Sequence, residues 1–521
     1  MQSISHKIEI IQRQAQYHSD PTLFSNHFAA SRSATLLLET AEIKKKNNLE
    51  SIMIVDSAIR ISAIKNSVQM TALSINGQAI LAAFKQTYHH TLTLLEKQSS
   101  LCFTFPTMNH NADEDEKILA LSIFDSFRFI MKLFSNTTKV SKGMFFGGLF
   151  SYDLIANFEQ LPDVIRTQKC PDLCFYLAET LLVLDHQKQQ CLIQSSIFSQ
   201  NTNEHKRIEI RSKDIQKMLQ QELSYTPPKI AHVHTNVTSN MSDAEYSSII
   251  TELQEFIQKG DIFQVVPSRK FFLSCYHALS AYQALKISNP SPYMFFMQDQ
   301  LFTLFGASPE SSLKYNRITR QVELYPIAGT RPRGKRTDGS IDYDLDSRIE
   351  LEMRTNQKEL SEHLMHVDLA RNDLARICEP GSRYVSELVK VDKYSHVMHL
   401  VSKVIGTLKS HLDALHAYAS CMNMGTLTGA PKVRAMELIA ACEKETRGSY
   451  GGAIGYFTDE GNLDTCITIR SAYIEKDMAT VQSGAGVVLN STAQEEVTES
   501  VNKAAAVINA IQTAHRLTGS F

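Results

Sequence analysis

The chain has 521 residues, with 53 lysines and arginines against 55 aspartates and glutamates, so its formal net charge is −2. Its length allows roughly two to four domains, and 43% hydrophobic residues is an ordinary globular composition, which argues against a disordered chain and against nucleic-acid binding through net positive charge. No segment approaches the ~20 apolar residues of a membrane-spanning helix, and charges interrupt the N-terminus where a secretory signal would be apolar. We therefore expect a cytoplasmic protein without membrane or nucleic-acid partners.

The first part of the chain combines helix-like stretches with short segments rich in β-branched residues. The segments that read as strands of an antiparallel sheet are residues 51–64, 174–185 and 190–198. A stretch rich in Pro, His, Asn and Thr, residues 226–240, interrupts both periodicities and is the best linker candidate. We therefore predict an N-terminal region over residues 1–240 and a second region over residues 241–521.

The second region is predicted to contain both helices and strands. A cap at Ser242 or its neighbour precedes apolar residues at helical spacing, and a longer helical region is expected over about residues 344–378. Residues 451–488 hold apolar runs broken by DEGN and EKD, which is typical of successive antiparallel strands. Thr492, with a glutamate three residues on, is a capping-box signature for a last helix that ends near Leu517.

Two acidic doublets could carry chemistry. Glu359 and Glu362 in the long helical region, and Glu496 and Glu499 in the last helix, are each spaced i, i+3, so the members of a doublet share one helical face. If the two faces meet, the crowded carboxylates need either raised pKa values or a cation between them, and Mg²⁺ suits such oxygen ligands. The alternative is that each doublet is a solvated helix face.

Histidines near these acids raise a competing zinc hypothesis. His363 and His366 follow the first doublet, and His396 and His399 lie in SHVMHLVS, but the His-Glu-x-x-His pattern of zinc hydrolases is absent. A neutral imidazole is also a suitable proton-transfer group near pH 7. We therefore keep one of these histidines as a catalytic candidate.

Three turns rich in glycine and hydroxyl groups could bind an anion. They are residues 326–334, 424–432 and 482–488, and none has the order of a P-loop or of a dinucleotide-binding turn. Their backbones can approach a carboxylate closely and present N–H groups to it. Together with Arg470 and Lys503 they could hold a dianionic substrate, although each turn alone also reads as a plain loop.

Several segments carry a resemblance to a known family. In chain order they are LLLETA, NPSPYMFF, PIAGTRPRGK, ELSEHLMHVDLARND, SHVMHLVS, MGTLTGAPK, GGAIGY, ITIRS, SGAGVV and EEVTESVNKA. The chain resembles the chorismate-utilising enzymes over nearly its whole length, and among them the branch that makes anthranilate. The resemblance implies an α+β fold in which antiparallel sheets pack in a sandwich-like core, with flanking helices and a central active-site cleft.

The resemblance also implies a metal and a substrate site. Mg²⁺ would be bound by Glu362 and Glu499, with Glu359 and Glu496 as supporting carboxylates. The positions that match chorismate-binding or other polar site residues of the family are Gly329, Thr330, Thr426, Tyr450, Arg470, Gly484, Ala485, Gly486 and Lys503.

Four further positions bear on the reaction. By resemblance, His399 assists loss of the pyruvyl group and Glu310 is the general acid for departure of the ring hydroxyl. Relatives that add water to chorismate carry a lysine base where this chain has Gln264, and aminodeoxychorismate synthase carries a nucleophilic lysine where it has Ala328. Neither residue can replace its lysine, so we expect direct attack by ammonia and elimination of pyruvate. The aminodeoxychorismate reaction is the alternative enzyme reading.

The supply of ammonia and the regulation of the reaction imply a partner subunit and an inhibitor. No Gly-x-Cys-x-Gly nucleophile motif is present, and the nearest cysteine, Cys421, lies in a synthase motif. A separate glutamine amidotransferase subunit is therefore implied, in a heterotetramer. Thr40, Pro292, Tyr293 and Met294 match the family's tryptophan feedback site, where serine is common in place of Thr40. A catalytically dead allosteric binding module is the non-enzyme alternative.

Overall fold

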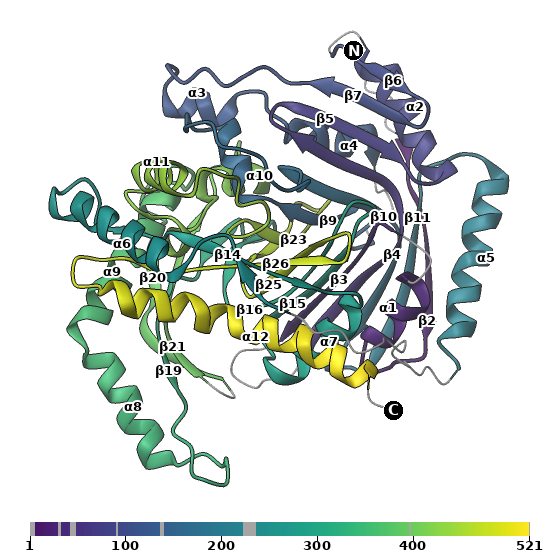
Figure 1. Ribbon diagram of the computed structural model, residues 1–521. Coiled ribbons are helices and arrows are strands. Elements are labelled where there is room, and N and C mark those ends of the chain that lie inside the picture. The colour runs from purple at the N-terminus through teal and green to yellow at the C-terminus, as the bar shows by residue number, and fades with distance from the viewer. Residues whose placement is uncertain are drawn as a thin grey trace.

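The computed structural model describes residues 6–29, 33–41, 48–89, 92–135, 140–221, 236–394 and 397–519. Most described strands belong to one large network of antiparallel strands, as Figure 1 shows at the centre of the molecule. Two short pairs lie outside it: β1 (His6–Lys7) with β8 (Phe134–Ser135), and β13 (Gln264–Val265) with β22 (Gly429–Ala430). The predicted mixture of helices with a large antiparallel sheet is therefore confirmed.

The three predicted N-terminal strands lie side by side. They are β4 (Asn48–Ile64), β10 (Leu173–Asp185) and β11 (Gln190–Ile197), and β10 is hydrogen-bonded to both of the others. Apolar side chains such as Met53 and Leu182 face each other across the β4–β10 pair and are buried. β-Branched and other apolar residues fit such a pleated, buried surface.

Strands from both sides of residue 240 pair with each other. β3 (Thr35–Ala41) pairs with β15 (Tyr293–Gln298), and β9 (Phe145–Phe150) pairs with β23 (Ala453–Thr458). Most of the predicted linker lies outside the described residues, and its last part holds β12 (Thr238–Ser239). The domain boundary at residue 240 stays a prediction.

The described helices cover the sheet and extend beyond it (Figure 1). They are α1 (Thr22–Ala29), α2 (Ile75–Tyr88), α3 (Glu114–Leu119), α4 (Asp125–Leu133), α5 (Thr202–Met218), α6 (Asp243–Gln258), α7 (Ala278–Ser288), α8 (Tyr343–Thr355), α9 (Gln357–Ala375), α10 (Ala414–Cys421), α11 (Lys432–Glu443) and α12 (Ala493–Gly519). α12 packs against α7 and α6, whereas α8 projects away from the body of the molecule.

Local signals set the helix boundaries. Ser242 caps α6 in a capping box, as predicted, and the hydroxyl of Thr492 accepts a hydrogen bond from the N–H of Glu495 at the start of α12. The long helical region expected near residues 344–378 is two helices rather than one. Asn356 has extended backbone dihedral angles, and its side chain caps α9 by accepting from the N–H of Glu359. This cap fixes where the first acidic doublet begins.

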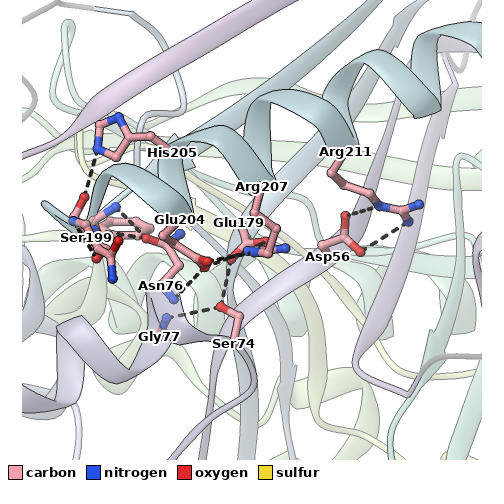
Figure 2. Close-up of polar contacts among 12 residues, drawn as sticks. Asp56, Ser74, Asn76, Gly77, Glu179, Ser199, Glu204, His205, Arg207 and Arg211 are labelled. Atoms are coloured by element: carbon pink, nitrogen blue, oxygen red, sulfur yellow. Dashed lines mark hydrogen bonds and ion pairs between the residues drawn. The ribbon is translucent and has the colours of Figure 1, made fainter.

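Helix α5 is bound to β10 and β4 by ion pairs whose carboxylates are buried (Figure 2). Arg207 bonds Glu179 at 2.6 Å and Glu204 at 2.8 Å, and Arg211 bonds Asp56 at 3.0 Å. Charges that are buried in this way must be paired to be tolerated. In Figure 1 this helix lies at the opposite end of the molecule from α9, so the cluster takes no part in the site below.

Candidate active site

One cavity of about 990 Å³ gathers the residues singled out from the sequence. Helices α9 and α12 contribute the acidic doublets, β19 (Ile327–Pro332) contributes Gly329 and Thr330, and β21 (Val397–Thr407) contributes His399. The catalytic, metal and substrate positions named above that line it are Gln264, Glu310, Gly329, Thr330, Glu359, Glu362, His399, Thr426, Tyr450, Arg470, Gly484, Gly486, Glu496, Glu499 and Lys503. Ala485 is fully buried outside the lining, where its N–H donates to the carbonyl of Pro267 and shapes the turn.

Both acidic doublets face this cavity, although they are far apart in sequence. Glu359 and Glu496 are largely buried, and each has one carboxyl oxygen that is shielded from solvent without a hydrogen-bond partner. Burial raises the pKa of both carboxyls, and the neighbouring glutamate of each doublet raises it further. A cation would satisfy these orphaned oxygens, so the donor set fits a hard metal ion such as Mg²⁺.

The other member of each doublet is more open. The side chain of Glu362 is 27% exposed and that of Glu499 is 47% exposed. Across the described chain, no three His, Cys, Asp or Glu side chains are grouped as a protein-made metal site. Mg²⁺ characteristically takes only one or two carboxylates and completes its shell with water and substrate oxygens.

Glu362 is held as an anion. Burial alone would raise the pKa of its carboxyl, but the nearby His366, Lys503 and Gln264 together bring the pKa below its ordinary value. The Gln264 amide donates to Oε1 of Glu362 at 3.1 Å, and Nε2 of His366 lies 3.8 Å from the same oxygen. Gln264 therefore acts on a carboxylate rather than as a base.

Two cationic side chains, Lys503 and Arg470, also line this cavity. Lys503 pairs with Glu499 at 2.5 Å and donates to the carbonyl of Gly484 at 3.0 Å. Burial lowers the pKa of Arg470, for which no ion pair is found among the described residues, and burial raises the pKa of Tyr450 to about 12. A half-buried guanidinium that makes no ion pair among the described residues, beside a phenol, suits an anionic ligand.

Glu310 has the properties of a proton donor. Its side chain is only 6% exposed, and burial raises its pKa to about 8, although the Thr426 hydroxyl and Lys503 act in the opposite direction. The Thr426 hydroxyl donates to Oε1 of Glu310 at 3.0 Å. At neutral pH this carboxyl is mostly protonated and can give a proton to a leaving group.

His399 lies in the same cavity as a neutral imidazole. Burial lowers its pKa to about 4, and the positive charge of Arg470 adds to this effect. Nδ1 lies 2.9 Å from the hydroxyl of Thr330, and the ring of Tyr394 meets the imidazole edge-on with 5.3 Å between the centroids. A neutral, oriented imidazole can accept a proton.

Comparisons with known proteins identify the family. A sequence family described as chorismate binding enzyme matches residues 95–509. Anthranilate synthase component 1 of Buchnera aphidicola subsp. Acyrthosiphon pisum (strain APS) is 69% identical over 517 residues, which is 99% of each chain. The protein of the same name from Escherichia coli (strain K12) is 54% identical over 521 residues, the whole of both chains. The chain belongs to the anthranilate synthase component 1 family.

Solved structures agree with this membership. The crystal structure of anthranilate synthase component I from Streptococcus pneumoniae TIGR4 matches with a TM-score of 0.66 and 26% identity, covering 88% of this chain and 92% of that one. MenF, the menaquinone-specific isochorismate synthase from Escherichia coli, has a TM-score of 0.67 at 17% identity, covering 98% and 96%. The second match shares the fold. None of the helices that the structure describes is long and apolar enough to cross a membrane.

The zinc reading gains no support in this member of the anthranilate synthase component 1 family. Nε2 of His363 is hydrogen-bonded to the Ser402 hydroxyl at 2.6 Å, and Nδ1 of His399 is occupied by Thr330. His366 lines the cavity beside Glu362, whereas His396 lies outside the described residues.

Sequence reasoning missed two neighbours of the site. Arg331 lines the cavity and pairs with Glu359 at 2.5 Å, and the ring of Tyr394 packs against His399. Arg331 was visible as a basic residue directly after the Gly329-Thr330 turn, which is a usable signal. Nothing local to Tyr394 indicates its position, because it reaches the site through the pairing of β20 (Tyr384–Lys393) with β21.

The two segments of the predicted tryptophan site are adjacent strands. Thr40 pairs with Tyr293 across β3 and β15, and the N–H of Ala41 donates to the carbonyl of Pro292 at 2.9 Å. The Tyr293 hydroxyl donates to Asp464 at 3.2 Å. Because side chains alternate along a strand, Met294 points to the opposite face, where it is buried in the core. Thr40 and Tyr293 thus share one face, and Met294 does not.

A second cavity, of about 400 Å³, contains none of the predicted residues. Arg447 lies between the two cavities, with its guanidinium 4.6 Å from the ring of Tyr152 and donating to the carbonyls of Leu427 and Val266. Those carbonyls belong to residues that line the larger cavity. The smaller cavity is therefore separate from the one that holds the acidic doublets.

Proposed function

We propose that the chain converts chorismate and ammonia to anthranilate and pyruvate in a Mg²⁺-dependent reaction, the first step of tryptophan biosynthesis. The observation that carries this proposal is the convergence of both acidic doublets, Arg470, Glu310 and His399 on one cavity. The names of the relatives that are 54–69% identical support the same activity. The sandwich-like packing, the cytoplasmic location and the role of the cavity as the central active-site cleft belong to the same proposal.

In this proposal Glu362 and Glu499 hold Mg²⁺, and Glu359 and Glu496, each with one buried and unpartnered carboxyl oxygen, are supporting carboxylates. The ion, when bound, neutralises charge on a carboxylate of chorismate. Arg470 and Lys503, with the Gly484–Gly486 turn and the Gly329-Thr330 turn, bind the substrate's remaining anionic and polar groups. Tyr450 and Thr426 complete the polar wall.

Two proton transfers follow from the pKa directions. As ammonia attacks the ring, Glu310 donates its proton to the departing ring hydroxyl, which leaves as water, and the ammonium group formed on the ring gives its extra proton to solvent. His399 then accepts the proton from the carbon that carries the new amine. The electron pair of that C–H bond completes the aromatic ring, and the neighbouring C–O bond breaks to release enolpyruvate, which takes up a proton to become pyruvate.

The choice of nucleophile follows from Gln264 and Ala328, which line the cavity where relatives carry lysines. A glutamine amidotransferase subunit supplies the ammonia, and two copies of each chain form a heterotetramer. Tryptophan inhibits through Thr40, Pro292, Tyr293 and Met294, with Met294 acting through the packing of β15 rather than by direct contact, since its side chain lies on the other face.

Incubation with chorismate, Mg²⁺ and ammonium, followed by fluorescence and mass spectrometry, tests the activity. We expect anthranilate and pyruvate in equal amounts, and no product when glutamine replaces ammonium for the isolated chain. A product that becomes aromatic only after a separate lyase is added would favour the aminodeoxychorismate reaction. Binding of chorismate with no turnover would favour the non-catalytic binding module.

A further inference from the structure

A bulge in β19 brings two polar atoms to one nitrogen of His399. Ala328 pairs with Leu400 and Thr330 pairs with His399, so Gly329 is an extra residue between two consecutive pairs. Its φ of +65° lies in the left-handed region that glycine adopts without strain. The bulge places the Gly329 carbonyl 3.4 Å, and the Thr330 hydroxyl 2.9 Å, from Nδ1 of His399.

These two neighbours differ in what they can accept or donate. The carbonyl of Gly329 is only an acceptor, so it is attractive to Nδ1 only when that nitrogen carries the hydrogen. The Thr330 hydroxyl can then also accept from Nδ1, which leaves its own hydrogen to point into the cavity that Thr330 lines. In the other tautomer, the lone pair of Nδ1 would face the lone pairs of the carbonyl.

We propose that Thr330 is a positioning residue: the Gly329 carbonyl selects the Nδ1–H tautomer of His399, and the Thr330 hydroxyl, by accepting from the same N–H, holds the imidazole ring in its orientation. Nε2 is then the basic nitrogen, and no hydrogen-bond partner for it is found within the described chain. Tyr394 stabilises the same ring orientation by packing edge-on against the imidazole.

The consequence for catalysis rests on the proposed function. Loss of enolpyruvate requires Nε2 to take the ring proton, whereas the attack of ammonia does not use His399. Loss of the ring orientation therefore slows elimination more than amination, and the aminated, still non-aromatic ring accumulates.

The matched variants are Thr330→Val, which keeps the shape but removes the hydroxyl, and Thr330→Ser, which keeps the hydroxyl. Each is made in the full chain with ¹⁵N,¹³C-ring-labelled histidine, and the His399 signals are assigned by their loss in His399→Gln. We expect the Nδ1–H tautomer in all three proteins, because the Gly329 carbonyl that selects it is retained, and a shifted Nδ1 proton signal with faster exchange of that hydrogen in Thr330→Val alone. Circular dichroism checks that all variants fold.

Kinetics with ammonium give the second readout. At saturating chorismate, which removes any effect of Thr330 on substrate binding, we expect elimination to fall about 10- to 100-fold more than amination in Thr330→Val, a part of what loss of a general base removes, and elimination to recover in Thr330→Ser. An Nε2–H tautomer in the wild type would overturn the proposal, as would equal slowing of both steps or equal damage in both variants. If the wild type makes no anthranilate while the tautomer is as expected, the proposed function fails and the positioning role stands.

Discussion

Replacing Glu310 by Gln should inactivate the protein and stabilise its fold at neutral pH. The carboxyl is 6% exposed and burial raises its pKa from 4.5 to about 8. At pH 7 it is mostly protonated in the folded chain but ionised in the unfolded one, so folding takes up nearly one proton. The contribution of this group to the free energy of unfolding therefore falls as the pH rises from about 4.5 to about 8, by about 1.4 kcal/mol per pH unit.

Added up from pH 4.5, the ordinary pKa of the carboxyl, this loss of unfolding free energy reaches about 3 kcal/mol at pH 7 and stays below about 1 kcal/mol at pH 5. Glutamine has nearly the shape of a protonated glutamate and does not titrate, so Glu310→Gln escapes the loss. Its free energy of unfolding should exceed that of the wild type by these amounts. Its turnover of chorismate with ammonium should fall at least about 100-fold, since the proton donor is gone.

Urea unfolding followed by circular dichroism at pH 5, 6, 7 and 8 measures the difference between the two proteins. Glu252→Gln, at an exposed position on α6, is the control and should show no comparable dependence on pH. A difference between Glu310→Gln and the wild type that stays constant from pH 5 to pH 8 would refute the idea that the folded chain keeps this carboxyl neutral.

Four further substitutions test the active site and the predicted tryptophan site. Glu362→Gln or Glu499→Gln should abolish Mg²⁺-dependent turnover, because each removes a proposed anionic ligand of the metal ion, while the thermal unfolding midpoint changes little; full activity in a Mg²⁺ titration would remove the metal assignment. His399→Met should slow release of pyruvate more than amination, measured by rapid quench and mass spectrometry, and equal slowing would contradict a base role. Thr40→Ala should weaken inhibition by tryptophan roughly five- to tenfold, the value of one hydrogen bond, with Thr40→Ser as control; a wild type that tryptophan does not inhibit would leave that pocket without a function.

The sequence by itself determined which chemical groups this protein has and where its local elements begin. Capping signals at Ser242 and Thr492 placed two helices, and the β-branched segments placed β4, β10 and β11, because these signals act between residues close in the chain. The ordered motifs also indicated the family, because a motif is recognised from its residue types and their order, without knowing which residues are in contact. The break at Asn356 was missed, because helical periodicity continues through it.

Only the tertiary structure decided which of these groups meet and how acidic they are. Glu362 and Glu499 lie far apart in the sequence, and their convergence on one cavity depends on how α9 and α12 are placed around the sheet, which spacing does not encode. The pKa directions of Glu310 and His399 follow from burial, which is a property of the whole fold. The contact of Thr330 with His399 likewise depends on strand register, where a one-residue bulge decides what each side chain faces.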